Sequence, residues 1–102
     1  MHFIYIIYST KADRYYVGES ADPRKRLIKH NAGDLKTYTG KHIDWQLKAV
    51  FEIDGSRAQA IAIEKFIKRQ KSRVFLEKII EHDFVPSGKL AALKRVEKVS
   101  KS

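Results

Sequence analysis

Two apolar runs near the N-terminus, joined by a short polar segment, most constrain the fold of this chain. Residues 2–8 read His-Phe-Ile-Tyr-Ile-Ile-Tyr, and residues 15–19 read Tyr-Tyr-Val-Gly-Glu. β-Branched and aromatic side chains favour strands, and residues 9–14 are polar enough to form a turn. A short connection between two such runs predicts an antiparallel β-hairpin.

The next signals predict a helix and a third strand. Asp22-Pro23 supplies a capping side chain followed by proline at the first helical position, so we expect a helix through His30 that ends at Gly33. A polar loop over residues 34–45 should follow. Residues 45–53 alternate loosely between apolar and polar side chains, which is typical of a strand.

Two further helices are expected after an Asp54-Gly55 turn. Ser56 and Gln59 fit a capping box in front of a helix with an apolar stripe, and Ser72 can cap the helix after it. The predicted fold is α/β (α+β), with a three-stranded antiparallel sheet flanked by helices in the order β-β-α-β-α-α. We predict one domain over residues 1–83. A basic tail, which can form a helix, follows over residues 84–102.

The charge of the chain points to a polyanionic partner. Lysine and arginine number 21 against 12 acidic residues, a formal net charge of +9. Nucleic acid is the first candidate partner and an anionic membrane surface the second. The chain has no cysteine, which excludes disulfides and thiolate sites. We find no signal peptide and no span of membrane-crossing length, and so expect a cytoplasmic protein.

Two tyrosines in the hairpin are candidate catalytic residues. Residues two apart in a strand share a face, so a symmetric hairpin would place Tyr5, Tyr16 and Gly18 on one face. Gly18 would then leave an open space beside the Tyr5 ring, where a phosphate could approach. The alternative is that both tyrosines are ordinary cross-strand packing.

Arg26 and His30 are four residues apart and should be neighbours on one helix surface. Arginine can clamp a phosphate and stabilise the charge that develops on it, and histidine can pass a proton near neutral pH. The alternative is a solvated basic helix face.

Glu64 borders the apolar stripe of the later helix, where an unpaired carboxylate is costly. Mg²⁺ takes one or two protein carboxylates and completes its shell with water and substrate phosphate. One glutamate beside a phosphate site is therefore enough to hold the metal ion. The alternative is a salt bridge to Lys68 at i+4.

Four blocks, taken in order, resemble the GIY-YIG nuclease family, and its small stand-alone members in particular. They are Phe3-Ile4-Tyr5, Tyr16-Val17-Gly18, Asp22-Pro23-Arg24-Lys25-Arg26-Leu27-Ile28-Lys29-His30-Asn31 and Ala60-Ile61-Ala62-Ile63-Glu64-Lys65-Phe66-Ile67-Lys68. The resemblance covers residues 2–80. It implies a small α/β fold with a central three-stranded sheet, and hydrolysis of a phosphodiester with a divalent metal, Mg²⁺ or Mn²⁺.

The resemblance also implies roles for the five candidate residues. Tyr5 and Tyr16 would position or deprotonate the attacking water, and Arg26 would steady the phosphate. His30 would relay a proton and Glu64 would hold the metal.

We expect a nucleic-acid partner, DNA more than RNA, contacted largely through the phosphate backbone. The expected contacts are Gly18, Lys25, Lys29, Lys36, Lys41, Lys94 and Arg95. Phosphate contacts carry no base information, so cutting should be directed by structure rather than sequence, as in repair or recombination, and a protein partner could supply targeting. The alternatives are a nucleic-acid-binding module that does not cut, and a basic adaptor protein on the same fold.

Overall fold

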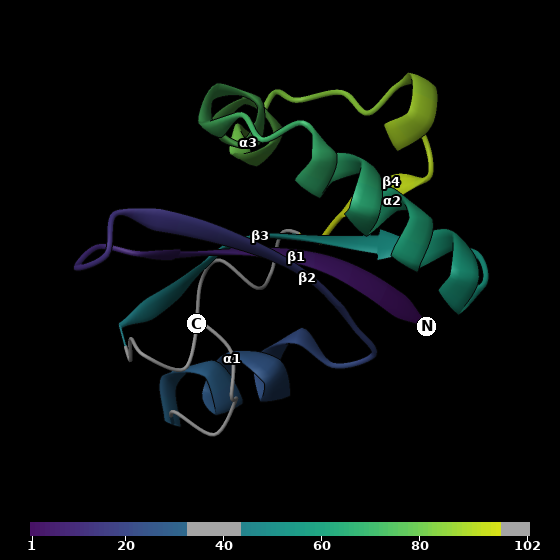
Figure 1. The fold of residues 1–102 in the computed structure, drawn as a ribbon. Helices are drawn as coiled ribbons and strands as arrows, with labels where there is room; N and C mark the ends of the chain where they lie inside the picture. The colour runs from purple at the N-terminus through teal and green to yellow at the C-terminus, as the bar shows by residue number, and fades with distance from the viewer. Residues whose placement is uncertain (33–43, 97–102) are drawn as a thin grey trace.

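The computed structural model describes residues 1–32 and 44–96, which build a four-stranded antiparallel sheet with helices on both faces (Figure 1). The elements in chain order are β1 (His2–Ser9), β2 (Arg14–Ser20), α1 (Pro23–Ala32), β3 (Trp45–Ile53), α2 (Arg57–Arg69), α3 (Arg73–Ile80), the short 3₁₀ helix η2 (Gly88–Leu90) and β4 (Leu93–Arg95). The helices α2 and α3 lie over one face of the sheet and α1 lies over the other (Figure 1). The strand order is β2-β1-β3-β4, so β2 is an edge strand.

The predicted hairpin is confirmed. Strands β1 and β2 pair with Tyr5 opposite Gly18 and Ile7 opposite Tyr16. Because alternate residues of a strand share a face, this register places Tyr5, Tyr16 and Gly18 on the α1 face of the sheet. The third strand is also confirmed, and it pairs with the other side of β1.

A fourth strand corrects the predicted three-stranded sheet and the predicted helical tail. Leu90, Leu93 and Val96 have helical spacing, but Leu90 ends a 3₁₀ turn and Leu93 begins β4, which pairs with residues 51–53 of β3. An unpaired edge of β3 would expose a row of backbone donors and acceptors, and β4 satisfies part of it. The domain boundary at residue 83 stays a prediction, and the sheet continues across it.

Each face of the sheet has its own apolar core. On the α2 face, apolar side chains of the sheet pack against α2, α3 and the 88–93 segment. The buried residues are Ile4, Ile6, Val17, Ala49, Phe51, Ile53, Ala60, Ile63, Ile67, Ile79, Leu90 and Leu93. The smaller core on the α1 face contains Tyr5, Ile7, Trp45 and Val50, so an aromatic hydroxyl is buried there among apolar groups. That face holds most of the candidate site.

The helix starts match the capping signals. The side chains of Asp22, Ser56 and Ser72 accept hydrogen bonds from backbone N–H groups three residues later, at 3.2, 3.1 and 3.1 Å. Helix α1 extends to Ala32, and the predicted stop at Gly33 and the loop to residue 43 lie outside the described residues. None of the helices in the two described ranges has the length and apolar character needed to cross a membrane.

The end of α1 is tied to the start of β3 by one side chain. Asn31 Nδ2 donates to the Trp45 carbonyl at 3.0 Å, and the Trp45 N–H donates to Asn31 Oδ1 at 2.7 Å. This paired contact fixes the last turn of α1, and with it His30, against the sheet.

Candidate active site

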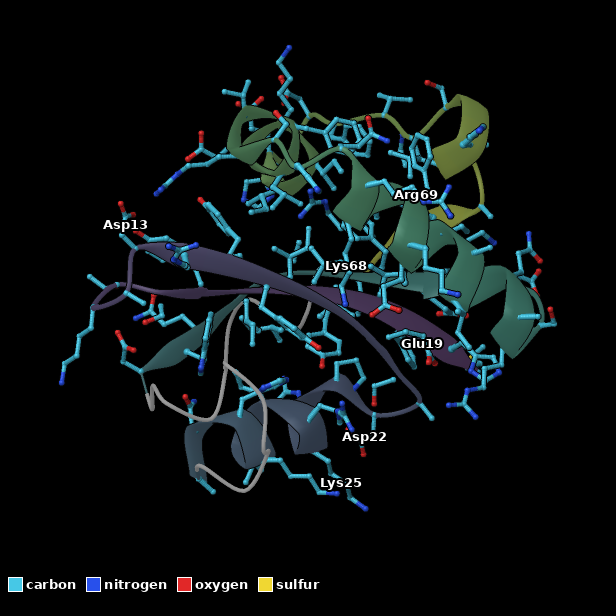
Figure 2. The ribbon with its side chains drawn as sticks, in the orientation of Figure 1. Asp13, Glu19, Asp22, Lys25, Lys68 and Arg69 are labelled. Carbon is cyan, nitrogen blue, oxygen red and sulfur yellow. The ribbon has the colours of Figure 1, made fainter. Side chains whose placement is uncertain are left out.

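Five polar residues from four elements converge at the β2 edge of the sheet. Tyr5 comes from β1, Tyr16 from β2, Arg26 and His30 from α1, and Glu64 from α2. Their neighbour Lys68 reaches from α2 toward β2 (Figure 2). The site therefore lies where α1 and α2, on opposite faces, flank the edge strand.

A buried hydrogen bond joins Tyr5 to His30. The Tyr5 hydroxyl lies 3.0 Å from His30 Nε2, and both side chains are fully buried. Burial, and to a lesser degree the charge of Arg26, lowers the pKa of His30 to about 4. The imidazole is therefore neutral near pH 7.

Arg26 forms the other contact of the Tyr5 hydroxyl. Burial raises the pKa of Tyr5, and a hydrogen bond from the Arg26 side chain opposes that rise. Arg26 Nε is buried without a hydrogen-bond partner among the described residues. A buried donor without a partner is costly, and on a partly exposed arginine it is typical of a site that receives an anion.

Tyr16 is the more accessible of the two tyrosines. Its ring lies 6.5 Å from the Tyr5 ring and 5.2 Å, edge-on, from the His30 ring, measured between centroids. The Tyr16 side chain is half-buried, whereas Tyr5 is fully buried. A ligand at the edge of the sheet can therefore reach Tyr16 but not Tyr5.

Glu64 forms the salt bridge to Lys68 that we gave as the alternative to metal binding. Lys68 Nζ lies 3.2 Å from Glu64 Oε2, and it also lies 4.9 Å from the centroid of the Tyr16 ring. The Glu64 side chain is 17% exposed, so it borders solvent as well as the core. Its charge contributes, as the smallest of several causes, to the raised pKa of Tyr5, which places it within electrostatic reach of that hydroxyl.

The donor set around Glu64 suits a metal that is completed by substrate. No group of three metal-ligating side chains occurs in the part of the chain that the structure describes. Mg²⁺ needs only one or two carboxylates when waters and a phosphate fill its remaining positions. The residues present fit such an ion, with Glu64 as its protein ligand.

The prediction of an open space over Gly18 is wrong. The Tyr5 ring occupies that space, because a Cβ built on Gly18 would overlap Cζ and Oη of Tyr5. Glycine is needed here so that the ring can lie against the β2 backbone. Gly18 itself is buried, which removes it as a contact for a phosphate.

Two residues near the site were not singled out from the sequence as part of it. Glu19 follows Gly18 and pairs with His2 at 3.4 Å and Arg57 at 3.7 Å. Lys68 appeared only as the partner of Glu64, and its position over Tyr16 needs the three-dimensional register of α2 on β2. Periodicity along α2 predicts that Lys68 neighbours Glu64 but not that it meets Tyr16.

The expected phosphate contacts lie in separate places. Lys25 and Lys29 are exposed on α1, and Lys25 points away from the sheet (Figure 2). Lys94 is exposed on β4, at the edge of the sheet opposite β2. Lys36 and Lys41 lie outside the described residues.

Arg95 has a structural task that differs from the predicted one. Its guanidinium donates to the carbonyls of Ile79, Ile80 and Glu81 at 2.7, 2.8 and 2.8 Å, at the end of α3. The same group lies 5.1 Å from the Phe51 ring centroid. Because its donors satisfy helix-end carbonyls, we do not retain Arg95 as a phosphate contact.

The chain is similar in sequence to known proteins. Residues 1–78 match the GIY-YIG catalytic domain. A UPF0213 protein of Halobacterium salinarum is 33% identical over 79 residues, which cover 74% of this chain and the whole of that relative. The matched range 1–78 contains all five residues that converge at the β2 edge.

Proposed function

The chain belongs to the GIY-YIG family, a family of nucleases, and from this premise we propose that it is a divalent-metal-dependent endonuclease that hydrolyses phosphodiester bonds in DNA. The observation that carries the proposal is the convergence of Tyr5, Tyr16, Arg26, His30 and Glu64 on one edge of the sheet. A hydroxyl, a guanidinium, an imidazole and a carboxylate are the groups that such a hydrolysis needs.

Tyr16 is the tyrosine that we assign to the attacking water. It is the one whose side chain reaches solvent, and its ring lies against His30. Tyr5 is fully buried and its pKa is raised by burial, so it stays protonated at neutral pH and cannot act directly as a base. Tyr5 is therefore a positioning residue in this proposal.

Arg26 and His30 supply charge and proton handling around Tyr5. Arginine has only donors, so the Tyr5 oxygen accepts from Arg26 and its proton is free to point at His30 Nε2. The neutral imidazole accepts this hydrogen bond and holds the Tyr5 hydroxyl in place. The fixed positive charge of Arg26 would stabilise charge that builds up on the phosphate.

Glu64 is the residue that would hold the metal. Held there, Mg²⁺ or Mn²⁺ would supply Lewis-acid chemistry toward a phosphoryl oxygen of the substrate. The salt bridge from Lys68 holds the Glu64 carboxylate toward the β2 edge, where Tyr16 and Arg26 also lie.

The substrate is proposed to be recognised by shape. The exposed lysines of α1 suit phosphate contacts, which position a duplex without identifying bases. We place the protein in the cytoplasm, acting on branched or nicked DNA in repair or recombination, with targeting supplied by a protein partner.

The test is nicking of supercoiled plasmid and branched DNA with Mg²⁺ or Mn²⁺. We expect cutting by the wild type, loss of cutting in Glu64→Gln, and normal cutting in Glu81→Gln, a control that removes an exposed carboxylate far from the site. Binding in EDTA should be nearly equal in all three. Glu64→Gln that cuts like the wild type would contradict the assignment.

Metal binding by Glu64 has a readout that does not depend on activity. Mn²⁺ should broaden the NMR signals of Tyr16 in the wild type with bound DNA, and should not do so in Glu64→Gln. Equal broadening in both proteins would place the metal elsewhere.

A nucleic-acid-binding module that does not cut is the second candidate. The salt bridge from Lys68 supports it, because the Glu64 carboxylate already has a partner without a metal. Salt-sensitive binding without nicking in either metal would favour this candidate.

A further inference from the structure

An open groove of about 710 Å³ lies next to the site, between the tip of the β1–β2 hairpin and the junction of α2 and α3. We call it the hairpin groove; its walls come from residues 12–17 and from residues 67–76. We propose that it binds the phosphate backbone of the nucleic-acid strand that extends from one side of the cut. This inference rests on the proposed nuclease function and names a binding site for its substrate.

The hairpin groove is continuous with the candidate active site. Tyr16 and Lys68 line it, and Lys68 is the residue that binds Glu64. The groove runs from these two residues toward Asp13 at the tip of the hairpin, on the α2 side of the sheet (Figure 2). A strand whose phosphate lies at Tyr16 would therefore enter the groove without leaving the protein surface.

The lining of the groove has more positive than negative side chains. Lys71 is exposed and takes part in no side-chain hydrogen bond or ion pair with the described residues, and exposed Arg14 acts on Asp13 only through its charge. The one acidic residue in the lining, Asp13, is paired with Arg73 at 2.5 Å. Uncompensated positive charge along a groove is the electrostatic feature expected of a phosphate-binding surface.

The chain turns at both walls of the groove. Asp13 and Lys71 have φ angles of 53° and 47°, and no other non-glycine residue of the described ranges has a positive φ. Asp13 stands in the turn of the hairpin, and Lys71 directly follows the C-cap of α2, where a left-handed residue commonly ends a helix. The turn at Lys71 places its exposed side chain in the lining of the groove.

The walls of the groove are held together before any ligand binds. Arg73 donates to the side chain of Asp13 and, at 3.3 Å, to its carbonyl, which ties α3 to the hairpin. The Arg73 guanidinium also lies 5.4 Å from the Tyr15 ring centroid. Such a preorganised surface loses little conformational entropy when a strand binds.

The test measures binding of labelled single-stranded DNA, duplex DNA and RNA of the same sequence by fluorescence anisotropy, in EDTA and over a series of salt concentrations. The test protein is the double variant Arg14→Gln/Lys71→Gly. The matched control is Lys65→Gln/Lys78→Gln, which removes two exposed charges from α2 and α3 outside the groove. Glycine at position 71 suits the positive φ, so the melting temperature should not fall for that reason.

We expect the double variant to bind on the order of 30-fold more weakly near 0.1 M salt, with a salt slope smaller by about 1.5, as two lost phosphate contacts require. The control should keep the wild-type slope. A double variant that binds like its control, while the wild type binds and cuts, would overturn the groove and leave the nuclease proposal standing. A wild type that binds none of the three probes would overturn both. A larger loss on DNA or on RNA identifies which polymer the groove takes.

Discussion

The Tyr5 hydroxyl and His30 Nε2 lie 3.0 Å apart although 25 residues separate them in the chain. The contact joins the central strand β1 to α1, and both side chains are fully buried. Arg26 donates to the same hydroxyl. One buried group therefore holds α1 on the sheet and orders the polar residues of the candidate site.

Removing that hydroxyl should cost stability as well as activity. We expect Tyr5→Phe to lower the free energy of unfolding by about 1–3 kcal/mol, because His30 and Arg26 each lose a buried hydrogen-bond partner. Tyr16→Phe should cost less, since the Tyr16 side chain is only half-buried. Urea unfolding of both variants checks the difference, and equal stability of Tyr5→Phe and the wild type would contradict it. Both variants should lose nicking.

Gly18→Ala should disrupt the site from the β2 side. The new methyl group would overlap Cζ and Oη of Tyr5, so the ring or the β2 backbone must shift and the hydrogen bond to His30 is disturbed. We expect a loss of about 1–3 kcal/mol in unfolding free energy, as for other overpacked cores. Gly55→Ala is the control, because its methyl group meets only the end of the exposed Gln59 side chain, which can rotate away. Similar losses in the two variants would contradict the proposed close approach.

The lowered pKa of His30 predicts how stability depends on pH. His30 has a pKa of about 4 in the folded protein against 6.5 as the reference value, so the unfolded chain binds more protons between these values. The stabilisation is complete above pH 6.5 and is lost as pH falls toward 4. We expect this residue alone to reduce the free energy of unfolding by about 2 kcal/mol between roughly pH 7.5 and pH 5.

His30→Gln is the comparison for the pH effect. The variant should be less stable near pH 7 but should show a smaller loss over the same interval, measured by urea unfolding at each pH. An unchanged pH dependence in His30→Gln would assign the effect to another group.

Much of the fold could be predicted from local signals in the sequence. The hairpin, the third strand and the helix starts at Asp22, Ser56 and Ser72 each depend on neighbouring residues, and all are found in the structure. Strand β4 could not be predicted in this way. A three-residue strand has too few alternations to reveal its period, and the helical spacing of Leu90 and Leu93 arises from a turn that brings both into one core.

The candidate site was predictable as a set of residues but not as an arrangement. The resemblance in the four blocks singled out Tyr5, Tyr16, Arg26, His30 and Glu64, and the structure brings them together. How deeply each of these residues is buried depends on packing between elements that are distant in sequence. The sequence therefore did not indicate that Tyr5 is buried and Tyr16 accessible. The same limit explains the wrong prediction for Gly18, because the space beside it is filled by the Tyr5 ring from the neighbouring strand.

Arg95 provides a last prediction, which separates a structural cation from a phosphate contact. Its guanidinium donates to three carbonyls at the end of α3 and packs on Phe51, so Arg95→Met should lower the free energy of unfolding by about 1.5–3 kcal/mol. Lys94→Gln, an exposed neighbour on the same strand, should leave stability unchanged. The salt slope of DNA binding should stay at the wild-type value in Arg95→Met, because no phosphate contact is lost. If Arg95→Met kept the wild-type stability and its salt slope of DNA binding fell by about 0.9, Arg95 would instead be a phosphate contact.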